Sequence, residues 1–125
     1  MQQTCLIAAH DPWFIQLLRI YTEESGLRPV QAYEGQEVLP LVHKESPAVI
    51  LLQADLPGEI KGLDLLCSLR QDPQMKSIPV LLFSWMNIES LDQAVTQSAV
   101  YLQEPVTYDA FQDALQKAGI CISKR

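Results

Sequence analysis

One segment, from Pro47 to Gly62, constrains the fold of this 125-residue chain more than any other. Within it, Ala48–Leu52 is an uninterrupted run of apolar residues with turn-forming residues on either side. Such a run predicts a β-strand that is covered on both faces, as in a parallel sheet. The strand would carry Gln53 and Asp55 to the carboxyl edge of the sheet, and open α/β sheets bind ligands in the crevice beyond that edge.

Short apolar segments and amphipathic segments alternate along the rest of the chain. The expected strands are Thr4–Ala9, Leu27–Tyr33, Ala48–Gln53, Pro79–Ser84 and Ala99–Leu102. The expected helices begin at Pro12, Gln36, Leu63 and Asn87 and after Pro105. This alternation predicts parallel pairing with right-handed crossovers, and therefore an α/β fold built as a three-layer α/β/α sandwich.

Prolines refine this outline at three places. Asp11 followed by Pro12 is typical of a helix start, with the aspartate as N-cap and the proline in the first helical position. Pro29 favours an outer strand, because proline donates no hydrogen bond to a neighbouring strand. Pro40 lies inside the second expected helix and should loosen its first turns.

Charge and hydropathy argue against nucleic-acid binding and against a membrane-spanning protein. The net charge of −6 and the pI of about 4.7 argue against a nucleic-acid-binding surface, because phosphate contacts depend largely on Lys and Arg. No stretch reaches about 18 apolar residues, so the sequence predicts no membrane span. The N-terminus lacks the basic region of a signal peptide, and a cytoplasmic location is therefore the expectation.

The length suits one domain with a single core. We expect a single domain over residues 1–125, with a core from about residue 3 to about residue 119 and a C-terminal tail, 120–125, that frays. The three cysteines, Cys5, Cys67 and Cys121, are odd in number and lack the spacing of a metal site. They are expected to be reduced thiols.

The pattern around Gln53 resembles the receiver domain of two-component response regulators. In that family a hydrophobic strand leads into an aspartate, followed by two residues, Leu-Pro-Gly and a glycine before a Leu-rich helix. Here the sequence QADLPG starts at Gln53, and Gly62 precedes the third expected helix. The resemblance covers nearly the whole chain and implies a flavodoxin-like (βα)5 fold, with a five-stranded parallel sheet in the order 2-1-3-4-5.

The resemblance also implies where the chemistry should lie. The family is phosphorylated on the aspartate after the third strand, here Gln53, and an acidic pair after the first strand, here Ala9 and His10, helps to hold Mg²⁺. An amide is not a useful nucleophile, alanine has no ligand atom, and a single His nitrogen suits Mg²⁺ poorly. Asp11, the next residue, has a sufficient role as helix N-cap. Gln53 can still donate and accept hydrogen bonds, and could bridge neighbouring loops.

Further positions follow the fourth and fifth strands. Ser84 fits the hydroxyl position of the family, and Tyr101 matches the aromatic position that reorients on activation. Glu104 stands before Pro105, where the family has a lysine, and a carboxylate there would repel a phosphoryl group. Trp85 replaces a residue that is usually small in the family, and its indole would narrow the access of a phosphodonor.

The resemblance therefore implies a degenerate "pseudo-receiver" without catalytic residues. The implied function is that of a phosphorylation-independent protein–protein interaction module in two-component or phosphorelay signalling, not an enzyme, with Mg²⁺ binding lost or weak. The implied partner is a protein, either a histidine kinase or an effector, and the implied surface is the face of helix 4, strand 5 and helix 5. A homodimer through these elements is a further expectation.

Three alternatives remain open. Phosphorylation could have moved to Asp55 or Asp11, although Asp55 lies two residues farther along the chain than the usual acceptor. A metal or ligand site could be rebuilt from His10, Asp11, Asp55 and Glu104, a set that suits Zn²⁺, Fe²⁺ or Mn²⁺ better than Mg²⁺. Flavin binding is disfavoured, because the loop Ala9–Pro12 lacks a Ser/Thr/Gly-rich phosphate cradle.

Overall fold

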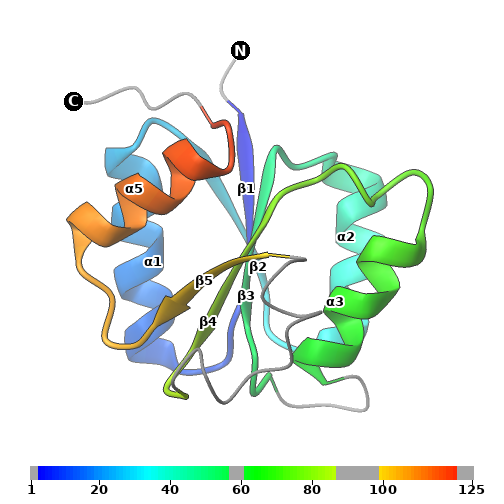
Figure 1. The fold of residues 1–125 in the computed structure, drawn as a ribbon, viewed down its shortest axis with the longest axis horizontal. Helices are drawn as coiled ribbons and strands as arrows, with labels where there is room; N and C mark the ends of the chain where they lie inside the picture. The colour runs from blue at the N-terminus through cyan, green and yellow to red at the C-terminus, as the bar shows by residue number, and fades with distance from the viewer. Residues whose placement is uncertain (1–2, 57–60, 87–98, 121–125) are drawn as a thin grey trace.

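The computed structural model describes residues 3–56, 61–86 and 99–120. Five parallel strands form one sheet in the order β2-β1-β3-β4-β5 (Figure 1). The strands are β1 (Thr4–Ala8), β2 (Arg28–Ala32), β3 (Val49–Gln53), β4 (Val80–Ser84) and β5 (Val100–Gln103). The register places Leu6 beside Ile50, and Leu52 beside Leu82. The predicted α/β class and the strand order implied by the resemblance are both confirmed.

Helices cover both faces of this sheet. They are α1 (Pro12–Glu24), the 3-10 turn η1 (Gly35–Glu37), α2 (Val38–Glu45), α3 (Gly62–Gln71) and α5 (Tyr108–Lys117). In Figure 1, α1 and α5 lie together on one face of the sheet, and α2 and α3 lie on the other. The helix expected to begin at Asn87 falls outside the described residues. Within the described ranges, no helix is long and apolar enough to cross a membrane.

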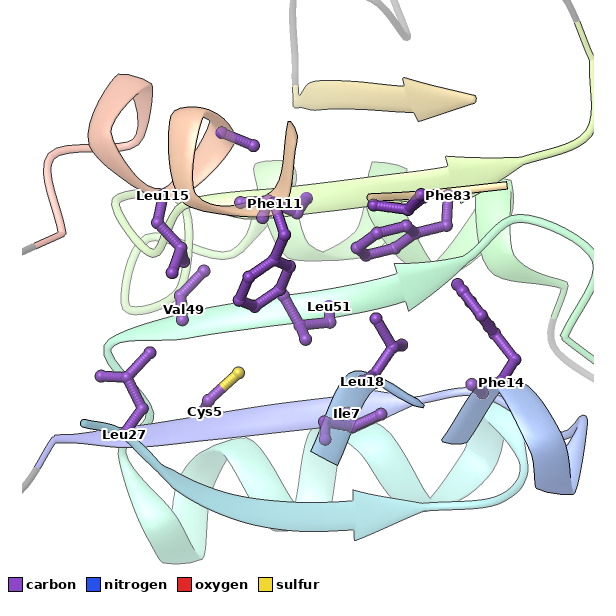
Figure 2. Close-up of a cluster of buried hydrophobic side chains, with 14 of the residues drawn as sticks. Cys5, Ile7, Phe14, Leu18, Leu27, Val49, Leu51, Phe83, Phe111 and Leu115 are labelled. Carbon is purple, nitrogen blue, oxygen red and sulfur yellow. The ribbon is translucent and has the colours of Figure 1, made fainter. Parts of the chain in front are cut away.

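Alternation along the central strands divides the apolar core into two clusters. The cluster beneath α1 and α5 includes Cys5, Ile7, Phe14, Leu18, Val49, Leu51, Phe83 and Phe111 (Figure 2). The cluster beneath α2 and α3 includes Leu6, Val38, Ile50, Leu52, Leu66 and Leu82. Successive side chains in a strand point to opposite faces, so covering both faces of β3 explains its continuous apolar run. The same alternation directs Gln53, two residues after Leu51, towards α1 and α5.

The prolines act largely as the sequence predicts. The Asp11 carboxylate accepts a hydrogen bond from the Trp13 N–H at 3.1 Å and caps α1. Pro29 lies in β2, which is an edge strand. Pro40 is the third residue of α2, a position whose N–H has no partner within a helix. Pro40 therefore costs α2 no backbone hydrogen bond, contrary to the expectation that it would loosen the first turns; the segment before α2 is the 3-10 turn η1.

Element boundaries differ from the predicted ones by a few residues. The first strand ends at Ala8, not at Ala9. The last helix begins at Tyr108 and does not follow Pro105 directly. Its start is fixed by Thr107, whose hydroxyl accepts a hydrogen bond from the Ala110 N–H at 3.1 Å. The predicted turn after β5 is therefore longer than expected, because an N-cap residue rather than the proline sets the first helical turn.

The cysteines in the described residues are free thiols, as predicted. Cys5 is fully buried in β1, and burial raises the pKa of its thiol to about 12, against a small opposing effect of a hydrogen bond with Thr22. Cys67 is exposed on α3. Since the thiolate is the reactive form, Cys5 serves as an inert core residue.

Candidate functional site

The carboxyl ends of four neighbouring strands bring the predicted site residues to one edge of the sheet. Gln53 is the last residue of β3 and Ser84 is the last residue of β4. Ala9 follows β1, and Glu104 follows β5. Because these strands are parallel and adjacent, their carboxyl ends share the edge at which open α/β sheets form ligand sites.

Gln53 connects two loops at this edge. Its side chain is 3% exposed, and its Oε1 accepts a hydrogen bond from the backbone N–H of His10 at 3.2 Å. Its side chain also forms a hydrogen bond with that of Glu104, and this contact partly opposes the rise in the pKa of Glu104 that burial causes. An amide can take part in both contacts, because it has a carbonyl acceptor and an NH₂ donor. Gln53 therefore links the end of β3 to the residues that follow β1 and β5.

Glu104 is a buried carboxyl group at the end of β5. Its side chain is 6% exposed, and its backbone N–H donates to the Ser84 carbonyl at 2.7 Å. The peptide bond between Glu104 and Pro105 is cis. The carboxyl atom Oε2 is closed off from solvent and has no hydrogen-bond partner among the residues that the structure describes.

The surroundings of Glu104 disfavour its charged form. Burial is the main cause that raises the pKa of Glu104, and the negative charges of Asp55 and Asp11 raise it further. The hydrogen bond with Gln53 and the charge of His10 oppose this shift. These interactions show that His10, Asp11 and Asp55 lie within electrostatic reach of Glu104, at the crevice beyond the carboxyl edge of the sheet. The crevice is anionic, in contrast to the cationic site that a lysine at position 104 would give.

We expect Glu104→Gln to stabilise the protein near neutral pH. Because the pKa of Glu104 is above its ordinary 4.5 in the folded state, the folded protein binds the proton more tightly than the unfolded chain. Wild-type stability therefore falls as the pH rises from 4.5 through the folded pKa. The variant lacks this penalty and should be more stable near neutral pH, on the order of 1 kcal/mol.

Urea unfolding of wild type and Glu104→Gln at several pH values measures the difference. Below the ordinary pKa of 4.5, glutamic acid and glutamine are both neutral, so the two proteins should converge. An advantage of the variant that stays constant across this pH range would contradict the assignment to Glu104. Glu24→Gln removes an exposed carboxylate of α1 and serves as the control with no expected effect.

The residues that follow β1 and β3 at this edge differ in solvent exposure. Ala9 is fully buried in the core, whereas His10, Asp11 and Asp55 are exposed. Asp11 has the N-cap role described above. In residues 3–56, 61–86 and 99–120, no group of three or more His, Cys, Asp or Glu side chains is arranged to hold a metal ion. In the described residues, His10, Asp11, Asp55 and Glu104 therefore do not come together as a metal-binding group.

Ser84 and Tyr101 are brought together on a separate side of the edge. The Ser84 hydroxyl accepts a hydrogen bond from the Met86 N–H at 3.1 Å. The Tyr101 hydroxyl donates to the Met86 carbonyl and lies 3.4 Å from the Ser84 carbonyl. Both side chains therefore contact the backbone that follows β4, which is a shared contact that their separation in the sequence did not reveal.

A pocket beside the crevice was not predicted. Its volume is about 200 Å³, and Trp13, Trp85, Asp11 and Glu104 are among the residues that line it. Trp85 does lie near the site, as expected, but it is 64% exposed and Trp13 is 73% exposed. The sequence did contain a signal, because Trp13 falls outside the apolar stripe of α1 and is therefore an aromatic residue without a place in the core.

Gly62 holds α3 against the end of β3. A Cβ atom at this position would lie 2.4 Å from the Gln53 carbonyl oxygen and 2.6 Å from the Ala54 carbonyl oxygen. Both distances are far below ordinary contact, so only glycine allows the helix to approach this closely. The sequence indicated a glycine before the helix, but it did not indicate which backbone atoms require it.

Comparison with protein families gives a match over most of the chain. The family described as "Response regulator receiver domain" matches residues 5–116. Among curated proteins, the polar-differentiation response regulator DivK of Brucella ovis is 24% identical over 118 residues, which cover 93% of this chain and 95% of DivK.

Solved structures share the fold. A putative response regulator from Chloroflexus aurantiacus superimposes with a TM-score of 0.84 at 25% identity, covering 94% of this chain and 98% of the other. The receiver domain of a sensor histidine kinase from Pseudomonas aeruginosa, with a magnesium ion coordinated in its active site cleft, superimposes with a TM-score of 0.82 at 18% identity. It covers 95% of this chain and 99% of that domain.

Proposed function

Because this chain belongs to the family of response regulator receiver domains, which act in two-component signalling, we propose that it is a pseudo-receiver that signals without being phosphorylated. In this proposal it is a protein–protein interaction module and not an enzyme. Receiver domains interact with kinases and effectors, so a histidine kinase or an effector is the proposed partner.

The observation that carries the proposal is the buried pairing of Gln53 with Glu104. Phosphoryl transfer relies on positioning and on neutralising negative charge. At this edge an amide stands where the nucleophile would be, and a buried carboxyl group stands where a cation would be. The acceptor position thus holds an amide that is not a useful nucleophile, and its neighbour Glu104 supplies negative charge in place of a cation.

Binding of Mg²⁺ is proposed to be lost or weak for the same reason. Mg²⁺ prefers oxygen ligands, chiefly carboxylates, in near-ideal octahedral geometry. At the acidic-pair positions Ala9 has no ligand atom and His10 has only ring nitrogens. The neutral amide of Gln53 lacks the charge of the carboxylate that it replaces. The Mg²⁺ that the related Pseudomonas aeruginosa domain holds is thus not expected here.

The proposed interaction surface is the face of helix 4, strand 5 and helix 5. Of these elements, β5 and α5 are described, whereas residues 87–98 are not. Tyr101 lies in β5 and bonds to the backbone at the end of β4 and just after it, and we propose that this contact couples the face to the site. A homodimer through the same face and a cytoplasmic location remain part of the proposal.

Intact mass measurement after incubation with acetyl phosphate and Mg²⁺ tests the proposal. We expect no added phosphoryl group on the wild type, while a receiver that keeps its aspartate gains one under the same conditions. Gln53→Asp alone should be modified weakly, because the new carboxylate would lie beside Glu104 without a neutralising cation.

A stable adduct on the wild type would overturn the proposal. Peptide mapping would then decide between the exposed carboxylates Asp55 and Asp11. Loss of the adduct in Asp55→Asn would assign it to the displaced site, which is the second candidate function. Asp55 is favoured over Asp11 for this role, because Asp11 already accepts the hydrogen bond that caps α1.

A further inference from the structure

The pocket beside the crevice has walls of aromatic side chains. It lies between α1 and the segments that follow β4 and β5, and its volume is about 200 Å³. Trp13, Phe14 and Tyr21 of α1 line it together with Trp85. Both tryptophans of the chain are therefore in this pocket, and both expose most of their indole surface.

Two of the aromatic rings that line the pocket, those of Phe14 and Tyr21, are held by contacts with neighbouring residues. The Tyr21 hydroxyl donates to the Val106 carbonyl at 3.0 Å, and the Tyr21 ring packs against Tyr108 at a centroid distance of 5.3 Å. The Phe14 ring meets Phe83 edge-on at 5.5 Å (Figure 2). Such contacts hold these rings in place before any ligand arrives, which reduces the entropy lost on binding.

Two carboxyl groups, those of Asp11 and Glu104, line the same pocket. Glu104 is more than nine-tenths buried, and its Oε2 has no hydrogen-bond partner among the described residues. The pocket lining that the structure describes contains no Lys, Arg or His. Aromatic faces and carboxyl groups both attract a cation, and none of the residues in that described lining supplies one.

We propose that this pocket binds the side chain of an arginine that a protein partner inserts between the two tryptophans. A guanidinium group is planar, stacks on aromatic faces and donates bidentate hydrogen bonds to carboxylates. It therefore matches a pocket that combines indole rings with Asp11 and Glu104 better than a lysine ammonium, which is more strongly hydrated. A metal ion fits less well, because the described residues hold no group of three ligating side chains.

Binding would also change the interior of the site. Because Oε2 is closed off from solvent, the Glu104 side chain must turn towards the pocket to meet the guanidinium. That movement would weaken the hydrogen bond between Glu104 and Gln53. Because Gln53 also accepts a hydrogen bond from the His10 N–H, a shift of the Gln53 side chain would change the position of the loop after β1. The partner's cation would thus act at the position where the family carries its own lysine. This inference rests on the proposed function as an interaction module.

Titration with N-acetyl-L-arginine amide at constant ionic strength tests the proposal. The emission of the two tryptophans and their indole N–H resonances report directly on the pocket, since no tryptophan lies elsewhere in the chain. We expect a saturable change with capped arginine. Capped citrulline, which has the same shape without the charge, should bind at least about tenfold more weakly.

Two variants and one control define the site. Glu104→Gln and Trp85→Ala should each weaken binding of capped arginine, the former by about tenfold. Glu24→Gln makes the same change of charge on α1, outside the pocket lining, and should bind as the wild type does. Trp85 is mostly exposed, so its variant keeps the test valid if Glu104→Gln were to disturb the fold. Trp13 then remains as the fluorescent reporter.

Three outcomes would overturn the arginine site. These are the absence of saturable binding to the wild type, equal binding of capped citrulline, and equal weakening by Glu24→Gln. The acetyl phosphate experiment separates this failure from a failure of the proposed function. A wild type that stays unmodified and ignores arginine refutes the pocket alone, whereas one that is phosphorylated and still binds arginine refutes the pseudo-receiver alone.

Discussion

We expect a variant that combines His10→Asp, Gln53→Asp and Glu104→Lys to gain a phosphoryl group from acetyl phosphate in the presence of Mg²⁺, and we expect the wild type to gain none. This is the largest functional effect that we expect, because the substitutions would rebuild the site that the pseudo-receiver proposal takes to be inactive. The three substitutions supply a metal-binding carboxylate, a nucleophile and a neutralising cation, which are the requirements of phosphoryl transfer.

The structure explains why the three changes are needed together. The His10 backbone N–H lies 3.2 Å from the Gln53 amide oxygen, so a carboxylate at position 10 would be close to the acceptor position. Gln53→Asp alone would place a second carboxyl group beside Glu104, which raises the pKa of both groups and deters an anionic phosphodonor. Glu104→Lys removes this repulsion and reverses the sign of the charge.

Intact mass with and without Mg²⁺ measures the result, and circular dichroism checks that the variant is folded. Adding Asp55→Asn to the triple variant should leave phosphorylation intact, because the modified residue would be at position 53. An inert but folded triple variant would show that the site differs in more than these residues. Modification that Asp55→Asn abolishes would instead locate the acceptor at Asp55.

Gly62→Ala is expected to destabilise the fold by about 3 kcal/mol, through overpacking at the junction of β3 and α3. A Cβ atom would lie 2.4 Å from the Gln53 carbonyl oxygen and 2.6 Å from that of Ala54. These are backbone atoms, so no side chain can rotate away to relieve the overlap. Either α3 or the end of β3 must move, and that movement displaces Gln53 from its contact with His10.

Gly119→Ala provides a matched control for this prediction. Gly119 has a φ of +82°, but among the described residues, apart from its neighbours in the chain, no atom lies within 4 Å of the position of a Cβ. Its substitution therefore adds only left-handed backbone strain, which costs about 1 kcal/mol. Urea unfolding of both variants should give a midpoint well below that of the wild type for Gly62→Ala and a smaller decrease for Gly119→Ala. Equal decreases would contradict the steric argument.

Much of the fold follows from local patterns in the sequence. The apolar run before Gln53 predicts a doubly covered strand, and the alternation of strands with amphipathic helices predicts the layered α/β architecture, as observed. The order of the strands came from resemblance to a family, since periodicity does not encode which strands pair. The start of the last helix differed from the prediction, because Thr107 caps its first turn and Pro105 does not begin it.

The sequence by itself determined which residues stand at the site, namely an amide at position 53 and a carboxylate at position 104. Only the tertiary structure decided how deeply these two side chains are buried, what they contact and in which direction the pKa of Glu104 shifts. Parallel strands carried Gln53 and Glu104 to one edge, where burial and the fields of Asp55 and Asp11 raise the pKa of Glu104. It also assembled Trp13 and Trp85 into one pocket from positions far apart in the sequence. Burial, pKa and pocket shape depend on distances between segments, and these distances are set by packing rather than by local sequence.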